Sequence, residues 1–135
     1  MNATDYRTLA EFRYQIRRFL AFSESAAKEF ELNSQQHQLL LALKGLPRGT
    51  APTISVLAER LQLRHHTTVE LVDRLCDRGY IKREIGTTDR REVHPRITKR
   101  GEGLLRKLTA IHRKELKSSG PALLATLRKL THENK

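Results

Sequence analysis

The chain has 135 residues, which suffice for one compact domain but not for two independent hydrophobic cores. Lys and Arg outnumber Asp and Glu by 26 to 15, and the net charge of +11 favours a polyanionic partner. A single cysteine excludes an internal disulfide, and no segment approaches a run of about 18 apolar residues. We therefore expect a cytoplasmic protein without a signal peptide or a membrane span.

The positive charge accumulates toward the C-terminus. Residues 99–135 carry 10 basic and 3 acidic side chains, whereas residues 1–59 carry 7 and 6. A solvated, lysine-rich helix would explain part of this surplus.

Apolar residues from about Asp5 to Phe30 follow the three-and-four spacing of one long helix. A helix of ~25 residues is roughly 38 Å long, which is longer than a small domain can cover. A second copy of the chain is therefore expected to bury part of the apolar stripe. The stripe comprises Leu9, Phe12, Ile16, Phe19, Leu20, Ala27 and Phe30.

A second helix is expected after Asn33, because Asn is a good N-cap and Gln36 completes a capping box. Four leucines at positions 39, 40, 41 and 43 make this helix a core element. The Gly and Pro residues between Gly45 and Pro52 then predict a loop.

Residues 53–97 read as helix, tight turn, helix and β-hairpin, which is the order of a winged helix-turn-helix. Only Gln62–Arg64 separate the two helices, so they must cross steeply, as in modules whose second helix enters the DNA major groove. Gly79 suits the left-handed end of the second helix. The apolar positions of the two helices are Ile54, Leu57, Ala58 and Leu61, then Thr68, Leu71, Val72 and Leu75.

The hairpin, or wing, is predicted from two short apolar runs. Residues 81–85 and 93–97 each begin and end on a β-branched residue and bracket the turn sequence Gly86-Thr87-Thr88-Asp89. Thr98 then suits the N-cap of another helix. Ser118-Ser119-Gly120-Pro121 is expected to end that helix, with Pro121 in the first turn of a last one. The prediction is a mainly α fold with one antiparallel wing.

With the wing identified, the chain resembles the MarR-type (multiple antibiotic resistance regulator) family of bacterial transcription regulators. The resemblance rests on residues 57–61 and 71–75, on Gly79, and on Asp89-x-Arg91 followed by Ile97-Thr98 and Gly101. It implies one domain over residues 1–135, with dimerisation helices at 1–31 and 99–135 around a winged helix-turn-helix DNA-binding module at 32–98. It also implies a homodimer, a pseudo-palindromic operator and, in many members, release by a small phenolic ligand or by cysteine oxidation.

The expected DNA contacts fall on three segments. His66, Val69 and Glu70 face away from the apolar side of the recognition helix, where they could meet base edges. The start of the first helix and the wing would contact phosphates. The full set is Arg64, His65, His66, Thr67, Thr68, Val69 and Glu70 on the recognition helix, Thr53 and Ser55 on the first helix, and Lys82, Arg83, Asp89, Arg90, Arg91 and Arg96 in the wing.

Glu70, Asp73 and Asp77 make the outward face of the recognition helix acidic, which is unfavourable beside phosphates. Glu70 could pair with Arg74 one turn on, and affinity is then expected to come mainly from the wing. Within the wing, Asp89 is expected to hold Arg91 in place, either aiming it at DNA or only closing the hairpin.

Enzyme and metal functions find no sequence support. No phosphate loop, nucleophile elbow or Cys/His ligand spacing is present, and the six histidines lie on different elements or, as His65 and His66, diverge on one. No catalytic residue, metal site or cofactor is predicted. Family members that sense peroxide hold a cysteine in the first helix, where this chain has none, so Cys76 is expected to be a half-buried, inert thiol.

The sequence thus predicts a dimeric repressor that binds double-stranded DNA. Two alternatives stay open: a sequence-indifferent, nucleoid-type DNA binder, suggested by the net charge, and a winged helix used for protein contacts, suggested by the acidic recognition face. The family resemblance places an aromatic or phenolic effector where the dimerisation region meets the module, with Tyr14, Phe30 and His37 as candidates, although core packing explains each of them as well.

Overall fold

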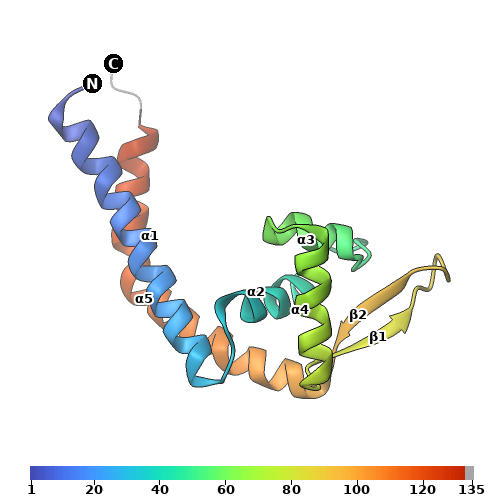
Figure 1. Ribbon diagram of the computed structural model, residues 1–135. Helices are drawn as coiled ribbons and strands as arrows, with labels where there is room; N and C mark the ends of the chain where they lie inside the picture. Colours follow the sequence, from blue (N-terminus) through green and yellow to red (C-terminus); the bar gives the residue numbers. More distant parts are fainter. Residues whose placement is uncertain (133–135) are drawn as a thin grey trace.

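A computed structural model describes residues 1–132 of the chain, so the last three residues of the predicted C-terminal range lie outside the described part. Its elements are α1 (Ala3–Glu29), α2 (Ser34–Lys44), α3 (Ile54–Leu61), α4 (His65–Asp77), β1 (Ile81–Ile85), β2 (Val93–Ile97) and α5 (Lys99–Thr131). Figure 1 shows two parts: a helical arm, in which α1 packs beside the second half of α5, and a winged helix module built from the remaining elements. The predicted fold class is confirmed.

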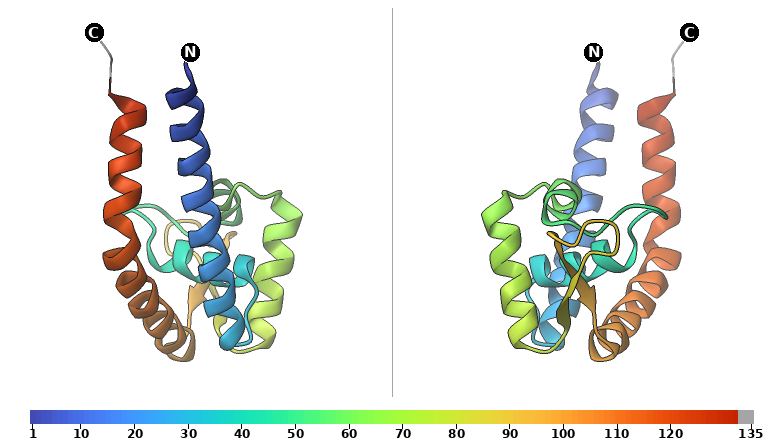
Figure 2. Two further views of the ribbon diagram at one scale, coloured as in Figure 1. Left: turned by 90° about the vertical axis from the view of Figure 1, so that its left-hand side faces the viewer. Right: turned by 90° about the vertical axis from the view of Figure 1, so that its right-hand side faces the viewer.

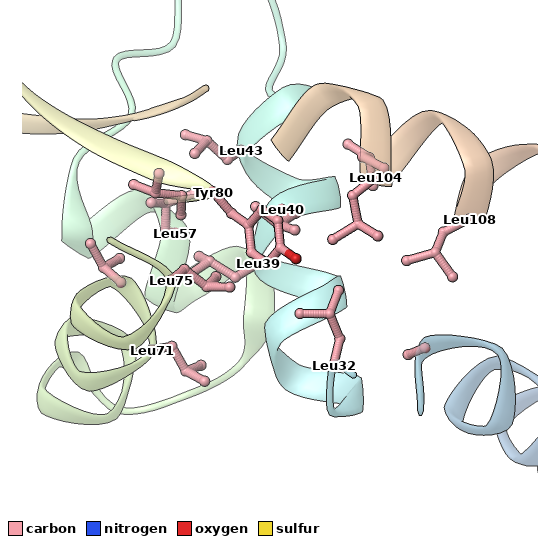
Figure 3. Packing of buried hydrophobic residues seen from close by; sticks show 14 of the residues in the cluster. Leu32, Leu39, Leu40, Leu43, Leu57, Leu71, Leu75, Tyr80, Leu104 and Leu108 are labelled. Atoms are coloured by element: carbon pink, nitrogen blue, oxygen red, sulfur yellow. The ribbon is translucent and has the colours of Figure 1, made fainter. Parts of the chain in front are cut away.

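The core of the module is centred on α2. Leu39 and Leu40 are completely buried, and α2 packs against α1, α3, α4, β2 and α5. Leu57 of α3 and Leu75 of α4 close the core on one side, and Leu104 and Leu108 of α5 close it on the other (Figure 3). The first turns of α5 therefore belong to the core of the module, although the sequence assigned residues 99–135 to dimerisation.

Local sequence signals define the ends of these helices. The capping box at α2 is formed in both directions: the Asn33 side chain accepts from the backbone N–H of Gln36, and the Gln36 side chain accepts from the backbone N–H of Asn33. Gly79 ends α4 with φ of 80°, and the next N–H, from Tyr80, reaches back to the carbonyl of Leu75 at 2.9 Å. Thr98 caps α5 as predicted, its side chain accepting from the N–H of Gly101.

Gly101 is required for another reason, the close approach of α5 to the strand that follows Gly79. A Cβ built at this position would lie 2.4 Å from the carbonyl oxygen of Tyr80 and 2.8 Å from the side chain of Ile97. That carbonyl accepts the backbone N–H of Thr98. A side chain at position 101 would therefore push the first turn of α5 away from the root of the wing.

The predicted break at Ser118–Pro121 is wrong, because α5 continues without interruption through Pro121. A proline inside a helix removes one backbone hydrogen bond and crowds the preceding turn, but Pro121 lies on the exposed side, where water can satisfy the freed carbonyl. Packing of α5 on α1 holds the helix together on both sides of this point, with Leu108 and Thr126 buried. Tertiary packing outweighs the local helix-breaking signal.

The arm leaves a large apolar surface uncovered, as its length predicted. Tyr6 is 64% exposed and Leu20 is 57% exposed on α1, and Leu124 is 47% exposed on α5. Figure 2 shows the two ends of the arm projecting beyond the module. Among the described residues, no helix has both the length and the hydrophobicity needed to cross a membrane.

Candidate nucleic-acid interface

The recognition helix α4 begins at a three-residue turn that fixes its angle to α3. Gln62 adopts a left-handed conformation with φ of 54°, and the N–H of Leu63 returns to the carbonyl of Ala58 at 2.9 Å. His65, His66 and Glu70 are exposed on the outer face of α4. These three predicted contacts are therefore accessible to a partner, as are Arg64 and, in part, Thr67 and Val69.

Thr68 is a correction to the predicted set. Its side chain is completely buried, and its hydroxyl donates to the carbonyl of Arg64 at 3.0 Å. Thr68 lies one turn before Leu71 and Val72 on the same helix face, so it belongs to the core. It cannot reach DNA.

Three predicted contacts from different segments meet at one place. Thr53 and Ser55 at the start of α3, and His65 at the start of α4, line a shallow hollow of about 220 Å³ together with residues 92–94 of the wing. Thr53 caps α3 by accepting the N–H of Val56 at 3.2 Å, so its hydroxyl proton is left to donate to another group. The first backbone N–H groups of α3 have no partner within the helix and also suit an anion.

The acidic face of α4 is partly neutralised by the wing. Asp73 accepts a hydrogen bond from Nη2 of Arg83, which ties β1 to the recognition helix. The expected pair between Glu70 and Arg74 is not formed among the described residues. Arg83 is consequently engaged with the protein itself, and its predicted role as a phosphate contact requires it to exchange Asp73 for DNA.

The other cations of the wing are also arranged around an acid. Glu84 on β1 pairs with Lys82 at 3.2 Å and with Arg96 at 3.4 Å, because Lys82 lies opposite Arg96 in the antiparallel register. Arg90 at the wing tip forms no ion pair with any described residue. The wing therefore presents one arginine without an ion pair to the described residues, and others that a carboxylate of the same protein holds in place.

Asp89 holds Arg91 as the sequence predicted. Oδ1 and Oδ2 of Asp89 accept from Nε and Nη2 of Arg91, both at 3.1 Å, and Oδ1 also accepts the backbone N–H of Arg91 at 3.0 Å. The contact raises the pKa of the Arg91 guanidinium and lowers the pKa of the Asp89 carboxyl, mainly through the side-chain hydrogen bonds. Arg91 is 91% exposed, so its guanidinium is aimed outward while it stays fully charged.

His94 is a wing residue that sequence reasoning missed. It is only 4% exposed, its Nε2 lies 3.3 Å from Glu92, and its Nδ1 has no partner among the described residues. A Cβ at Gly86 would lie 3.1 Å from the His94 ring, so the tight tip of the wing folds over this histidine. Apolar residues alternate along β2 at Val93, Pro95 and Ile97, which would place His94 on the polar side of the strand, so no sequence pattern indicated that His94 is buried.

The three candidate effector contacts do not share one hollow. Tyr14 lines a hollow of about 460 Å³ between α1 and α5, together with Phe19, Phe22 and Leu123 among others. Phe30 packs against the hydrophobic core instead. His37 is 2% exposed and belongs to the junction of α1, α2 and α5 described next.

At this junction, His37 lies 4.9 Å from the ring of His112, measured between ring centroids. Nε2 of His112 lies 2.7 Å from the hydroxyl of Ser23, and its Nδ1 lies 2.7 Å from the carbonyl of Leu108. Burial, together with the nearby His112, lowers the pKa of His37 to about 4. His37 is therefore neutral at physiological pH.

Cys76 is half-buried, and burial raises the pKa of its thiol. A thiol with a raised pKa forms little thiolate and reacts slowly with oxidants. Among the described residues, no group of three or more His, Cys, Asp or Glu side chains is placed to hold a metal ion.

One family model matches part of the chain. Residues 30–92, which span α2, α3, α4, β1 and the whole wing loop, match the model of the MarR family. A search of curated protein sequences gave no match.

Several solved structures share the fold. AbsC, a MarR family transcriptional regulator from Streptomyces coelicolor, superposes with a TM-score of 0.76 at 19% identity over 96% of this chain and 90% of its own. A mutant of MepR from Staphylococcus aureus, solved with an oligodeoxyribonucleotide, gives 0.68 at 19% identity over 90% and 93%. BpsR from Bordetella bronchiseptica, whose DNA binding is regulated by 6-hydroxynicotinic acid, gives 0.65 at 20% identity over 90% and 91%. The motif residues, the winged helix-turn-helix and the family match agree: residues 30–92 match the MarR family, and the whole chain shares the fold of MarR family regulators such as AbsC.

Proposed function

We propose that this protein is a transcription regulator, a repressor, that binds double-stranded DNA as a homodimer and catalyses no reaction. The observation that carries the proposal is the hollow in which Ser55 at the start of α3 and His65 at the start of α4 lie beside residues 92–94 of the wing, which directly follow the exposed Arg91. The MepR mutant that shares this fold and was solved with an oligodeoxyribonucleotide supports the same assignment.

In this proposal α4 lies in the major groove. His66 would donate to a purine acceptor, Val69 would contact a thymine methyl, and Glu70 would accept from cytosine. Arg90 and Arg91 at the wing tip would meet the adjacent minor groove and its phosphates. Thr53, Ser55 and the backbone of α3 would position the module on the phosphate backbone.

The uncovered apolar surface of the arm supports homodimerisation. Tyr6, Leu9 and Leu20 on α1 and Leu124 and Leu127 on α5 are each at least two-fifths exposed in the single chain. Many large exposed apolar side chains on one part of a protein mark an interaction surface. A two-fold dimer would then present two recognition helices to an inverted repeat in DNA.

An aromatic effector is part of the proposal, in the hollow between α1 and α5. Tyr14 and Arg18 lie on its rim, and Phe19 and Phe22 supply apolar walls. The hollow lies beside the junction of α1, α2 and α5, since the His112 ring makes edge contacts with Phe19 and Phe22. Ligand binding there could change the angle between the arm and the module, as BpsR, whose DNA binding responds to 6-hydroxynicotinic acid, suggests by analogy.

The test is competition between DNA sequences. Genomic fragments would be selected with the purified protein, and the best fragment would compete against random duplex at physiological salt. A repressor predicts at least a hundredfold preference for the selected fragment, since specific binding typically exceeds non-specific binding by about 10³ or more. Equal competition would indicate a sequence-indifferent binder, and no binding even at low salt would indicate a winged helix used for protein contacts.

A further inference from the structure

The first half of α5 carries a second cationic surface that the recognition of an operator does not use. We define the α5 basic face as Lys99, Arg106, Lys107, Arg113, Lys114 and Lys117. All six side chains are exposed, and none forms an ion pair with a described residue. Glu102, one of the two acids in this stretch, is already engaged by Lys44 at 3.0 Å.

Helical periodicity places these cations on one side of α5. Lys99, Arg106 and Arg113 follow each other at intervals of seven residues, or roughly 10.5 Å, and Lys107 and Lys114 form a parallel row. The opposite side of the same turns, which includes Gly101, Leu104 and Leu108, is buried in the core. The basic side therefore points away from the module.

This surface is separate from the recognition surface. In Figure 1, α2 lies between α3 and the first half of α5, and α2 packs against α3, α4 and α5. A duplex seated on α4 and the wing therefore contacts the module on one side of α2, and the α5 basic face lies on the other.

The shape and chemistry of the face suit a phosphate backbone. Arg106, Thr109 and Arg113 line a hollow of about 340 Å³ together with Leu105, Ala110 and the paired Lys44 and Glu102. Exposed small residues, Gly103 and Ala110, keep the middle of the face low between the two rows of cations. Arginine and lysine rows of this kind bind phosphates without reading bases.

A membrane surface fits less well. Amphipathic helices that lie in a bilayer interface insert large apolar side chains next to their cations. Within residues 99–117 the exposed side is cationic or small, and Leu116 is the one large apolar side chain that is exposed. The other leucines of this stretch, Leu104, Leu105 and Leu108, are buried in the core.

We propose that the α5 basic face binds the sugar-phosphate backbone of a second segment of double-stranded DNA, so that the protein can hold two DNA segments at once. This proposal rests on the proposed DNA-binding function. It gives a specific role to the positive charge that accumulates toward the C-terminus.

The experiment measures bridging by the full-length protein. A random-sequence duplex of about 30 base pairs is fixed to beads, protein is added, and capture of a second, fluorescent duplex of the same length is recorded. One variant neutralises the face with Arg106→Gln, Lys107→Gln, Arg113→Gln and Lys114→Gln. A matched control removes the same four charges from the arm with Arg7→Gln, Arg13→Gln, Arg17→Gln and Lys28→Gln, all of which are exposed.

The face-neutral variant should lose second-duplex capture by more than tenfold while its retention on the first duplex changes by less than threefold. The salt dependence of capture should become shallower by about 3 to 4 units of log affinity against log salt, from about 0.9 unit for each lost phosphate contact. The arm control should behave as wild type. A charge-keeping variant, Arg106→Lys with Arg113→Lys, should retain capture because the face keeps its positive charge. The preserved first-duplex binding of the face-neutral variant shows that its loss of capture is not a folding defect.

Three outcomes would overturn the inference. If the face-neutral variant captures the second duplex as well as wild type does, the dimer bridges through its two recognition surfaces. An equal loss in the arm control would mean that only net charge matters. First-duplex binding without any second-duplex capture would leave the face to a different anionic partner. Failure of wild-type protein to bind the first duplex at low salt would instead overturn the proposed function.

Discussion

Replacing Arg91 with alanine tests how the wing contributes to DNA affinity. The Arg91 guanidinium is anchored by two hydrogen bonds to Asp89 and is 91% exposed, so it is oriented before DNA arrives. No described residue accepts from its remaining amino group, Nη1. A narrow minor groove concentrates negative potential and attracts such an inserted arginine.

The expected loss follows from this geometry. Arg91→Ala should weaken binding to operator and random DNA alike by about 1 to 2 kcal/mol per subunit, the typical contribution of one charge-assisted contact. The slope of log affinity against log salt should become shallower by about one unit per subunit, because one phosphate contact is lost in each. Asp89→Ala removes the hydrogen bonds that orient the Arg91 guanidinium but leaves its charge in place. It should therefore weaken binding less and leave the salt slope nearly unchanged.

The assay is a fluorescence anisotropy titration at several salt concentrations, with circular dichroism to confirm folding. Arg17→Ala on α1 removes the same charge from an exposed position far along the chain from the wing and should change neither affinity nor slope by a measurable amount. Folded Arg91→Ala protein with unaltered affinity and unaltered slope would mean that Arg91 does not contact DNA. The Asp89–Arg91 pair would then serve only to close the hairpin.

Three further predictions concern the arm, the thiol and the junction. Deletion of residues 119–135 should weaken or abolish the dimer in sedimentation experiments, and a full-length protein that is monomeric at micromolar concentration would contradict the dimer. Cys76→Ala, or mild peroxide, should change operator affinity by less than about threefold, well under the 1.4 kcal/mol of a tenfold change; oxidative loss of binding that Cys76→Ala prevents would contradict an inert thiol. The pKa of His37 is lowered from 6.5 to about 4, so the native state disfavours its protonation. The stability that neutral His37 contributes is therefore complete above pH 6.5 and is lost as the pH falls to 4. Between pH 7 and 4 the free energy of unfolding should therefore fall by about 3 kcal/mol more in wild type than in His37→Gln; equal pH profiles would contradict a buried neutral His37.

The sequence predicted those features that depend on neighbours along the chain. Asn33 and Thr98 cap their helices because their side chains reach N–H groups three residues away, and Gly79 ends α4 because its own backbone takes a positive φ. Asp89 meets Arg91 across two residues. Interactions of such short range are encoded in local spacing.

Features that depend on distant packing were missed. Pro121 indicated a break, but contacts between α1 and α5, which lie at opposite ends of the sequence, keep the helix continuous. Thr68 is a different case: the apolar spacing of α4 already indicated that it lies in the core, and including it among the DNA contacts was wrong. The Asp73–Arg83 pair depends on how the wing folds back on α4, which no spacing rule specifies.

A two-fold dimer that reads DNA with α4 leaves a characteristic footprint. The footprint of the purified protein is measured on a genomic fragment selected at physiological salt. We expect two protected half-sites in inverted orientation, with centres one helical turn or ~10 base pairs apart on one face of the duplex. A protected region without inverted symmetry, or no fragment enriched over random DNA, would contradict it.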